Sequence, residues 1–188
     1  LISDNGIKAI STSMRIEPIR LEAKELVESL TSLLSEALSK MIARQKRICI
    51  LFSGGLDSSI IAKLSKDLGA ECTLYCAGTS SSRDIVNARR MSLALNMKLV
   101  QKEVSYDEIA ENVRNVVRLV ESTDMIRVST SLPIFFGVME SAKAGERIVL
   151  HGQGADELYG GYERYESTLA REGYSVICGD MLNDVKKL

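Results

Sequence analysis

The chain of 188 residues is 45% hydrophobic and 26% charged, and its formal net charge is −1 at pH 7. It is too apolar for a disordered chain, and its length suits a single domain with a sizeable core. The near-neutral charge argues against a broad nucleic-acid-binding surface, and no apolar run reaches the roughly 18 residues of a membrane helix. Four scattered cysteines and an N-terminus without a signal pattern favour free thiols and a cytoplasmic location. Composition leaves open whether the chain forms a homo-oligomer.

Residues 1–19 are mixed in character and predict a leader or an edge strand, whereas residues 20–188 predict one continuous domain. In that domain, short apolar runs alternate with amphipathic stretches. The predicted strands are 47–52, 71–76, 98–104 and 147–151. A first helix is predicted from about residue 21, a second from segment 53–59 to Leu68, and a third over 84–96. A fourth is predicted to begin at Ser105, which forms a capping box with Glu108. The chain from Tyr162 onward predicts further helical pieces. A loop carrying Arg127, Ser129 and Thr130 is predicted to lead into a further helix.

This alternation predicts an α/β fold, a parallel sheet with helices on both faces in a Rossmann-like three-layer sandwich. In such folds, ligands bind at the carboxyl ends of the strands. Six of the 13 glycines fall in two segments at such ends, SGGLDSS (53–59) and HGQGADELYGGY (151–162). We therefore look for the functional site in these two segments.

The first segment has the composition of a phosphate-binding turn. Gly54 and Gly55 allow a sharp turn that brings backbone amides close to a ligand, and the N-terminus of the following helix favours an anion. Three hydroxyl groups add donors: Ser53, Ser58 and Ser59. No lysine follows the glycines as it does in a Walker loop, so we expect a divalent cation with Asp57 as a ligand. The alternative is a plain strand-to-helix turn whose Ser and Asp residues serve as caps.

Both segments resemble one protein family. SGGLDSS is similar to the SGGxDS pyrophosphate loop of the N-type ATP pyrophosphatases, and HGQGADELYGGY resembles the SGEGSDELFGGY segment of asparagine synthetases and β-lactam synthetases. The chain is identified as an asparagine synthetase-like member of this superfamily, with the ATP pyrophosphatase domain at residues 20–188. The resemblance implies an adenine nucleotide alpha hydrolase-like fold. It also implies that ATP is cleaved between its α and β phosphates to form an adenylate, from which a nucleophile displaces AMP.

The resemblance also implies roles for individual residues. The implied nucleotide-binding residues are Leu51, Ser53, Gly54, Gly55, Asp57, Ser58, Ser59, Ala77, His151, Gly152 and Gly154. Asp57 and Asp156 would bind Mg²⁺ from opposite sides. The candidate catalytic residues are Arg127, in a segment similar to the family's IRAST, together with Gln153 and Glu157. Asp84 is either a helix cap or a ligand. For the second segment, the alternative is a glycine-rich turn in which Asp156 and Glu157 cap a helix.

Two departures from the family pattern bear on the reaction. Gln153 stands where the family usually has Glu, and a neutral amide orients a substrate but cannot act as a base, which puts aspartate-to-asparagine chemistry in question. The roughly 50 residues before the first segment are too few for the family's glutaminase domain. We therefore expect no glutaminase domain here, and nitrogen from free ammonia, another amine or a separate glutaminase subunit.

The leading hypothesis is an ATP- and Mg²⁺-dependent, adenylate-forming amide ligase. It would join a small carboxylic acid to an amine or ammonia through an acyl-adenylate. One alternative is another ATP pyrophosphatase, of the NAD synthetase-like or tRNA-modifying kind. The other is a non-catalytic nucleotide-binding module, which would bind ATP without forming AMP.

Overall fold

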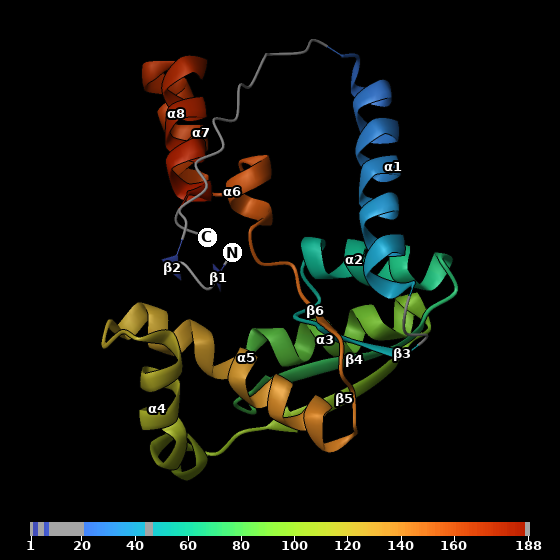
Figure 1. Cartoon of the computed structure of the whole chain (residues 1–188), viewed down its shortest axis with the longest axis vertical. Helices are drawn as coiled ribbons and strands as arrows, with labels where there is room; N and C mark the ends of the chain where they lie inside the picture. Colours follow the sequence, from blue (N-terminus) through green and yellow to red (C-terminus); the bar gives the residue numbers. More distant parts are fainter. Residues whose placement is uncertain (1, 4–5, 8–20, 44–46, 187–188) are drawn as a thin grey trace. The chain divides into compact units, whose positions relative to one another are not determined.

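The computed structural model describes residues 2–3, 6–7, 21–43 and 47–186 (Figure 1). The chain divides into two units, residues 1–33 and 34–188, each described by itself. In the first unit, strands β1 (Ile2–Ser3) and β2 (Gly6–Ile7) pair antiparallel. Helix α1 (Ala23–Ile42) begins in this unit and ends in the second. Most of the predicted leader at 1–19 lies outside the described residues.

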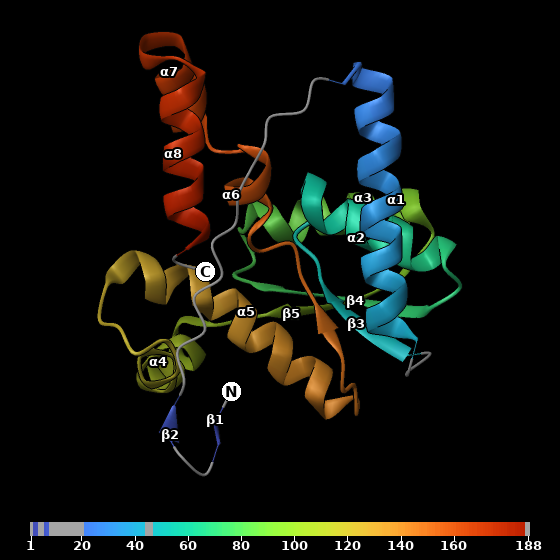
Figure 2. The ribbon, with the colours of Figure 1, turned by 45° about the horizontal axis from the view of Figure 1, so that its top comes forward.

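The second unit contains a four-stranded parallel sheet in the order β5-β4-β3-β6. Its strands are β3 (Arg47–Leu51), β4 (Glu71–Gly78), β5 (Lys98–Glu103) and β6 (Val149–Leu150). The four predicted strands are thereby confirmed, although β6 is shorter than the predicted 147–151. The strands lie adjacent in both views of the chain (Figures 1 and 2).

The remaining helices also agree with the sequence pattern, apart from a short helix at 155–159, which was not predicted, and the start of the helix at 125–143. They are α2 (Leu56–Asp67), α3 (Arg83–Leu95), α4 (Tyr106–Val120), α5 (Met125–Lys143), α6 (Ala155–Tyr159), α7 (Glu163–Glu172) and α8 (Tyr174–Val185). The capping box of Ser105 and Glu108 at the start of α4 is confirmed. No helix in the described part of the chain combines the length and the apolar character needed to cross a membrane.

The prediction that Arg127, Ser129 and Thr130 lie in a loop is wrong. These residues form the first turns of α5. The helix begins this early because Asp124 caps it: the backbone N–H of Arg127 donates a hydrogen bond of 2.9 Å to Asp124 Oδ1. Residues four apart in a helix lie on the same face, so Thr130 lies on the same face of α5 as Ile134.

The sheet lies between two helical layers. On β4, Leu74 and Cys76 pack in one core cluster with Ile85 and Ala88 of α3. Ala77 faces the other way and packs with Phe136 of α5. This alternation is the normal geometry of a strand covered on both faces. Figure 2 shows α2 and α3 on one side of the sheet and α5 on the other, which confirms the predicted three-layer arrangement.

The strand order reverses between β3 and β6. The chain passes from β3 to β4 and then to β5, and it returns through α4 and α5 to place β6 on the free side of β3. Connections on the two sides of such a reversal lie on opposite faces of the sheet, and the loops that leave the two strands form a crevice. The segment 53–59 leaves β3 and the segment 151–162 leaves β6, so both glycine segments lie at this point.

The turn after β3 yields a prediction about stability. Gly54 has φ +74°, and a Cβ added to it would lie 2.5 Å from the backbone carbonyl carbon of Asn87 and 2.6 Å from the backbone nitrogen of Ala88. We expect Gly54→Ala to lower the free energy of unfolding by about 2–5 kcal/mol, because backbone strain and overpacking add. Urea unfolding followed by circular dichroism measures this loss.

Gly69→Ala is the matched control. Gly69 has a similar φ of +80°, but none of the described atoms lies within 4 Å of an added Cβ. This variant therefore suffers backbone strain alone, which costs about 1–2 kcal/mol. Equal losses in the two variants would contradict the tight approach of the turn to α3.

Candidate nucleotide site

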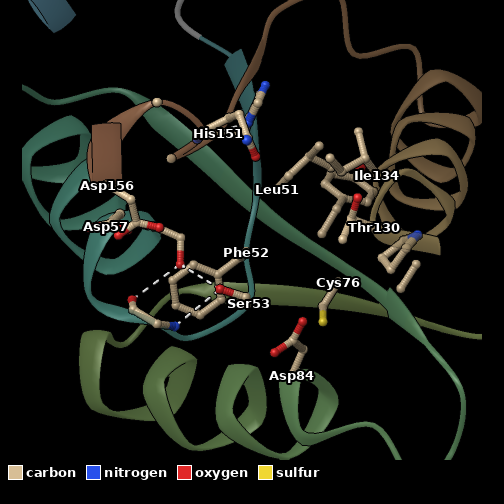
Figure 3. Close-up of a pocket in the computed structure, with 18 of the residues that line it drawn as sticks. Leu51, Phe52, Ser53, Asp57, Cys76, Asp84, Thr130, Ile134, His151 and Asp156 are labelled. Carbon is tan, nitrogen blue, oxygen red and sulfur yellow. Dashed lines mark hydrogen bonds between the residues drawn. The ribbon is translucent and has the colours of Figure 1, made fainter. Parts of the chain in front are cut away.

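A cavity of about 490 Å³ lies at the carboxyl ends of β3, β4 and β6. This volume is in the range of pockets that hold small ligands. Its walls come from both glycine segments, from the ends of β3 and β4, and from α5 (Figure 3). The reversal of the strand order therefore produces a cavity where the topology predicts one.

Most of the residues singled out from the sequence line this cavity. They are Leu51, Ser53, Gly55, Asp57, Ser58, Ala77, His151, Gly152, Gln153, Gly154, Asp156 and Glu157. Three others are not among the lining residues. Gly54 packs against α3, the hydroxyl of Ser59 is buried without a hydrogen-bond partner among the described residues, and Arg127 is exposed on the first turn of α5.

The first glycine segment leaves the start of α2 open to a ligand. Ser53 Oγ accepts a hydrogen bond of 3.2 Å from the backbone N–H of Gly55, and Ser58 Oγ lies 3.4 Å from Ser53 Oγ. Gly55 is the N-cap of α2, and no side chain caps the helix. The N–H groups of the first turn are thus available to an anion, and the helix dipole favours negative charge there.

The second glycine segment touches the first. A Cβ on Gly152 would lie 2.8 Å from the Cβ of Asp57, so the loop after β6 approaches α2 as closely as a backbone can. His151 stabilises this loop: its Nδ1 accepts a hydrogen bond of 3.1 Å from the backbone N–H of Gln153. Gly154 takes φ +90° and begins the short helix α6. Gly161 then leaves room for the carboxylate of Asp156, because a Cβ there would lie 2.0 Å from Asp156 Oδ1.

The lining concentrates negative charge. Asp57 and Asp156 lie beside each other at one side of the cavity, and Asp84 lies at another (Figure 3). Burial, and secondly the charge of Asp156, raise the pKa of Asp57 above its ordinary value. A divalent cation between the two carboxylates would remove this repulsion. Among the described residues, no set of three or more His, Cys, Asp or Glu side chains is arranged to hold a metal, so a cation here would complete its shell with water or ligand oxygens, as Mg²⁺ usually does.

The sequence did not reveal the apolar part of the cavity. Its lining residues without a prior assignment are Phe52, Tyr75, Cys76, Thr130, Pro133 and Ile134. Thr130, Pro133 and Ile134 share one face of α5, at the i, i+3, i+4 spacing that would have identified them had the segment been recognised as a helix. Leu51 and Ala77 lie against the same helix, because a Cβ on Gly137 would lie 2.8 Å from Leu51 Cδ2 and Ala77 packs with Phe136. The side of the cavity next to α5 is therefore largely apolar, whereas Asp57 and Asp156 lie at the side formed by the two glycine segments.

Glu157 differs from the other carboxylates of the lining because its side chain is buried. The residue is 8% exposed, and Tyr162 Oη donates a hydrogen bond of 2.6 Å to its Oε1. This bond, more than burial, raises the pKa of Tyr162 to about 12, so the phenol stays protonated and remains a donor. Tyr162 was predicted as the start of the helical tail, with no role in the site.

Comparison with known proteins identifies the family of the chain. Residues 29–179 match the sequence profile of the asparagine synthase family. The putative glutamine-hydrolyzing asparagine synthetase 1 of Methanocaldococcus jannaschii is 34% identical over 183 residues, which cover 97% of this chain and 33% of that protein. Asparagine synthetase 1 of Arabidopsis thaliana, also named glutamine-hydrolyzing, is 29% identical over 123 residues, which cover 60% of this chain and 21% of that protein. The chain thus spans a third or less of the length of these relatives.

A solved structure supports the fold alone. NMN synthetase from Francisella tularensis superposes with a TM-score of 0.50 at 21% identity, over 76% of this chain and 59% of that chain. The predicted fold class, a parallel sheet between helical layers, is therefore confirmed. Because the family profile matches most of the chain, including both glycine segments, the chain belongs to the asparagine synthase family.

Proposed function

We propose that this chain is the ATP-using synthetase part of an adenylate-forming amide ligase. The observation that carries the proposal is the meeting of the two glycine segments at the reversal of the strand order, with Asp57 and Asp156 beside each other in the cavity. Membership of the asparagine synthase family supports the same reaction class. The relatives are longer than this chain, so we propose, for this chain, only the synthetase part of their activity.

The two halves of the cavity suit the two ends of ATP. The apolar half, with Leu51, Ala77 and Ile134, suits the adenine ring. The polar half offers the first-turn N–H groups of α2 and the hydroxyls of Ser53 and Ser58 to the phosphates. The length of the nucleotide would then run from α5 toward the contact between the two loops.

Asp57 and Asp156 are the proposed magnesium ligands. Carboxylate oxygens are the protein ligands that Mg²⁺ prefers, and two such ligands leave positions for phosphate oxygens and water. The pKa of Asp57 is raised by burial and secondly by the charge of Asp156, and a cation between the two carboxylates would offset both effects. When bound, Mg²⁺ would offset the charge of the pyrophosphate leaving group.

The proposed reaction has two steps. In the first, an oxygen of the substrate carboxylate attacks the α-phosphorus of ATP, the bond to the bridging oxygen breaks, and pyrophosphate leaves. The N–H groups of α2 and the serine hydroxyls stabilise the charge that develops on the departing group. In the second, an amine or ammonia attacks the acyl-adenylate and releases AMP. Because the relatives are named glutamine-hydrolyzing, we propose that nitrogen is supplied by a glutaminase elsewhere in the protein or in a separate subunit.

ATP–pyrophosphate exchange tests the proposal. Labelled pyrophosphate should enter ATP when the protein is incubated with Mg²⁺ and one member of a panel of small carboxylic acids, and addition of ammonium should then yield the amide and AMP. The first step alone produces exchange, so the assay needs no knowledge of the nitrogen donor. Binding of Mg·ATP without exchange or AMP formation for any acid would overturn the proposal in favour of a nucleotide-binding module.

Replacing Asp57 tests the metal assignment through stability. A carboxyl group whose pKa is raised on folding binds its proton more tightly in the folded state, so its ionised form at pH 7 destabilises that state. Without metal or nucleotide, Asp57→Asn should raise the melting temperature at pH 7 by about 1–4 °C. The difference should shrink as the pH falls through the raised pKa of Asp57. Differential scanning fluorimetry across pH measures both effects.

The same variant should respond less to magnesium. Mg·ATP should raise the melting temperature of the unsubstituted protein through binding linkage, and Asp57→Asn or Asp156→Asn should lose most of that increase. Asp84→Asn is the matched control, because Asp84 lines the cavity away from the pair (Figure 3). An unchanged response in both variants, or an equal loss in the control, would refute the assignment of the two ligands.

A further inference from the structure

The lining of the cavity contains a carboxylate that the proposed metal site does not use. Asp84 lies at a side of the cavity away from Asp57 and Asp156 (Figure 3). The interpretation of Asp84 as a helix cap is wrong, because Ser82 is the N-cap of α3 and the Asp84 side chain forms no hydrogen bond or ion pair with the described residues. An ionised carboxylate is only an acceptor, so the oxygens of Asp84 are open to the hydrogen-bond donors of a ligand.

The contact between α3 and the first glycine segment fixes the position of Asp84 at one end. A Cβ on Gly54 would lie 2.5 Å from the backbone carbonyl carbon of Asn87 and 2.6 Å from the backbone nitrogen of Ala88. Asp84 precedes Ala88 by four residues, so it lies on the same face of α3 and about one helical turn, ~5.4 Å along the axis, from this contact. The carboxylate is therefore one turn of helix away from the segment proposed to bind the phosphates.

The neighbour of Asp84 on its other side is the carboxyl end of β4. Burial, and secondly the charge of Asp84, raise the pKa of Cys76 to about 11, so the carboxylate lies within electrostatic reach of this thiol. Figure 3 shows the Asp84 carboxylate directed from α3 toward the sheet, between Ser53 and Cys76. Ala77 follows Cys76 and belongs to the lining proposed for the adenine ring. Asp84 thus lies between the proposed phosphate end and the proposed adenine end of the cavity.

The part of ATP that joins adenine to the phosphates is the ribose. With the ring next to Ala77 and the phosphates next to Ser53, the ribose falls beside Asp84. A ribose carries two adjacent hydroxyl groups, and each oxygen of a carboxylate can accept one O–H donor. Such hydrogen bonds to an ionised group are among the stronger ones, and they offset the repulsion between the carboxylate and the phosphates.

We propose that Asp84 determines the sugar specificity of the site by accepting hydrogen bonds from the 2′ and 3′ hydroxyls of the nucleotide. The inference rests on the proposed function, because it requires ATP to occupy the cavity. A site built to bond a hydroxyl group rejects the analogue that lacks it, since the acceptor is then left unpaired. The cavity therefore selects ribonucleotides over deoxyribonucleotides.

Isothermal titration calorimetry with Mg²⁺ tests this selection without turnover. The nucleotides are ATP, 2′-deoxyATP, 3′-deoxyATP and 2′,3′-dideoxyATP. Because Asp84 is exposed, each lost hydroxyl should weaken binding by about tenfold, the low end for a hydrogen bond to a charged group. Equal affinity of the unsubstituted protein for ATP and the dideoxy analogue would overturn the inference.

Replacement of Asp84 assigns the preference to its carboxylate. Asp84→Ala should reduce the preference for ATP over the dideoxy analogue to within about threefold. The ratio of the two affinities cancels any uniform effect of removing a negative charge near the phosphates. Asp84→Asn keeps one acceptor oxygen, so it should retain most of the preference and of the affinity for ATP, which is why it also serves as the control for the metal ligands. An unchanged preference in Asp84→Ala would overturn the inference.

Ser82→Ala is the matched control for the start of α3. The Ser82 side chain makes no cap hydrogen bond and is not among the residues that line the cavity. This variant should therefore keep the full preference for ATP over the dideoxy analogue. A loss equal to that of Asp84→Ala would assign the effect to the conformation of α3 and overturn the role of the carboxylate.

The same titrations separate the inference from the proposed function. Binding that depends on the sugar and on Asp84, without pyrophosphate exchange for any acid, would support the inference and place the failure in the proposed reaction. Pyrophosphate exchange with no Asp84-dependent preference for ribose would overturn the inference alone. Absence of binding for every nucleotide would overturn both.

Discussion

The contact between Gly152 and Asp57 is the constraint on which the site depends. A side chain at position 152 would collide with α2, so the loop that leaves β6 lies directly against the loop that leaves β3. This approach needs β6 beside β3, which in turn needs the chain to return across the sheet through α4 and α5. The third wall of the cavity comes from the same return, because α5 supplies Thr130 and Ile134. One crossover therefore brings the second glycine segment and α5 to the ends of β3 and β4.

The loops of the site were predictable from sequence, and the wall contributed by α5 was not. In the loops, glycine, serine and aspartate have chemical roles that depend on local backbone geometry. A strand-to-helix junction that contains these residues therefore predicts an anion-binding site from sequence alone. In α5, the apolar residues surround the helix because it packs on the sheet, on α4 and along the cavity, and such a pattern has weak helical periodicity. Which of them face the ligand is decided by tertiary packing.

The link between Glu157 and Tyr162 was hidden for a related reason. The two residues are five apart in sequence, and they meet because Gly160, at φ +73°, ends α6 and turns the chain. Gly161 then makes room for Asp156 in the same turn. The two glycines of this turn thus place two adjacent carboxylates in separate environments, one beside Asp57 and one against a phenol. The composition of the segment predicts the turn, but it does not predict that the two carboxylates have different neighbours.

The brevity of β6 has a consequence for how a nucleotide enters. Two residue pairs, Cys49–Val149 and Ile50–Leu150, join this strand to β3, whereas five join β3 to β4. The backbone that carries the second glycine segment is therefore attached to the sheet by a short ladder, and local opening requires few hydrogen bonds to break. A bound nucleotide that contacts both loops would hold the second glycine segment against the first, which the two residue pairs of β6 do only weakly.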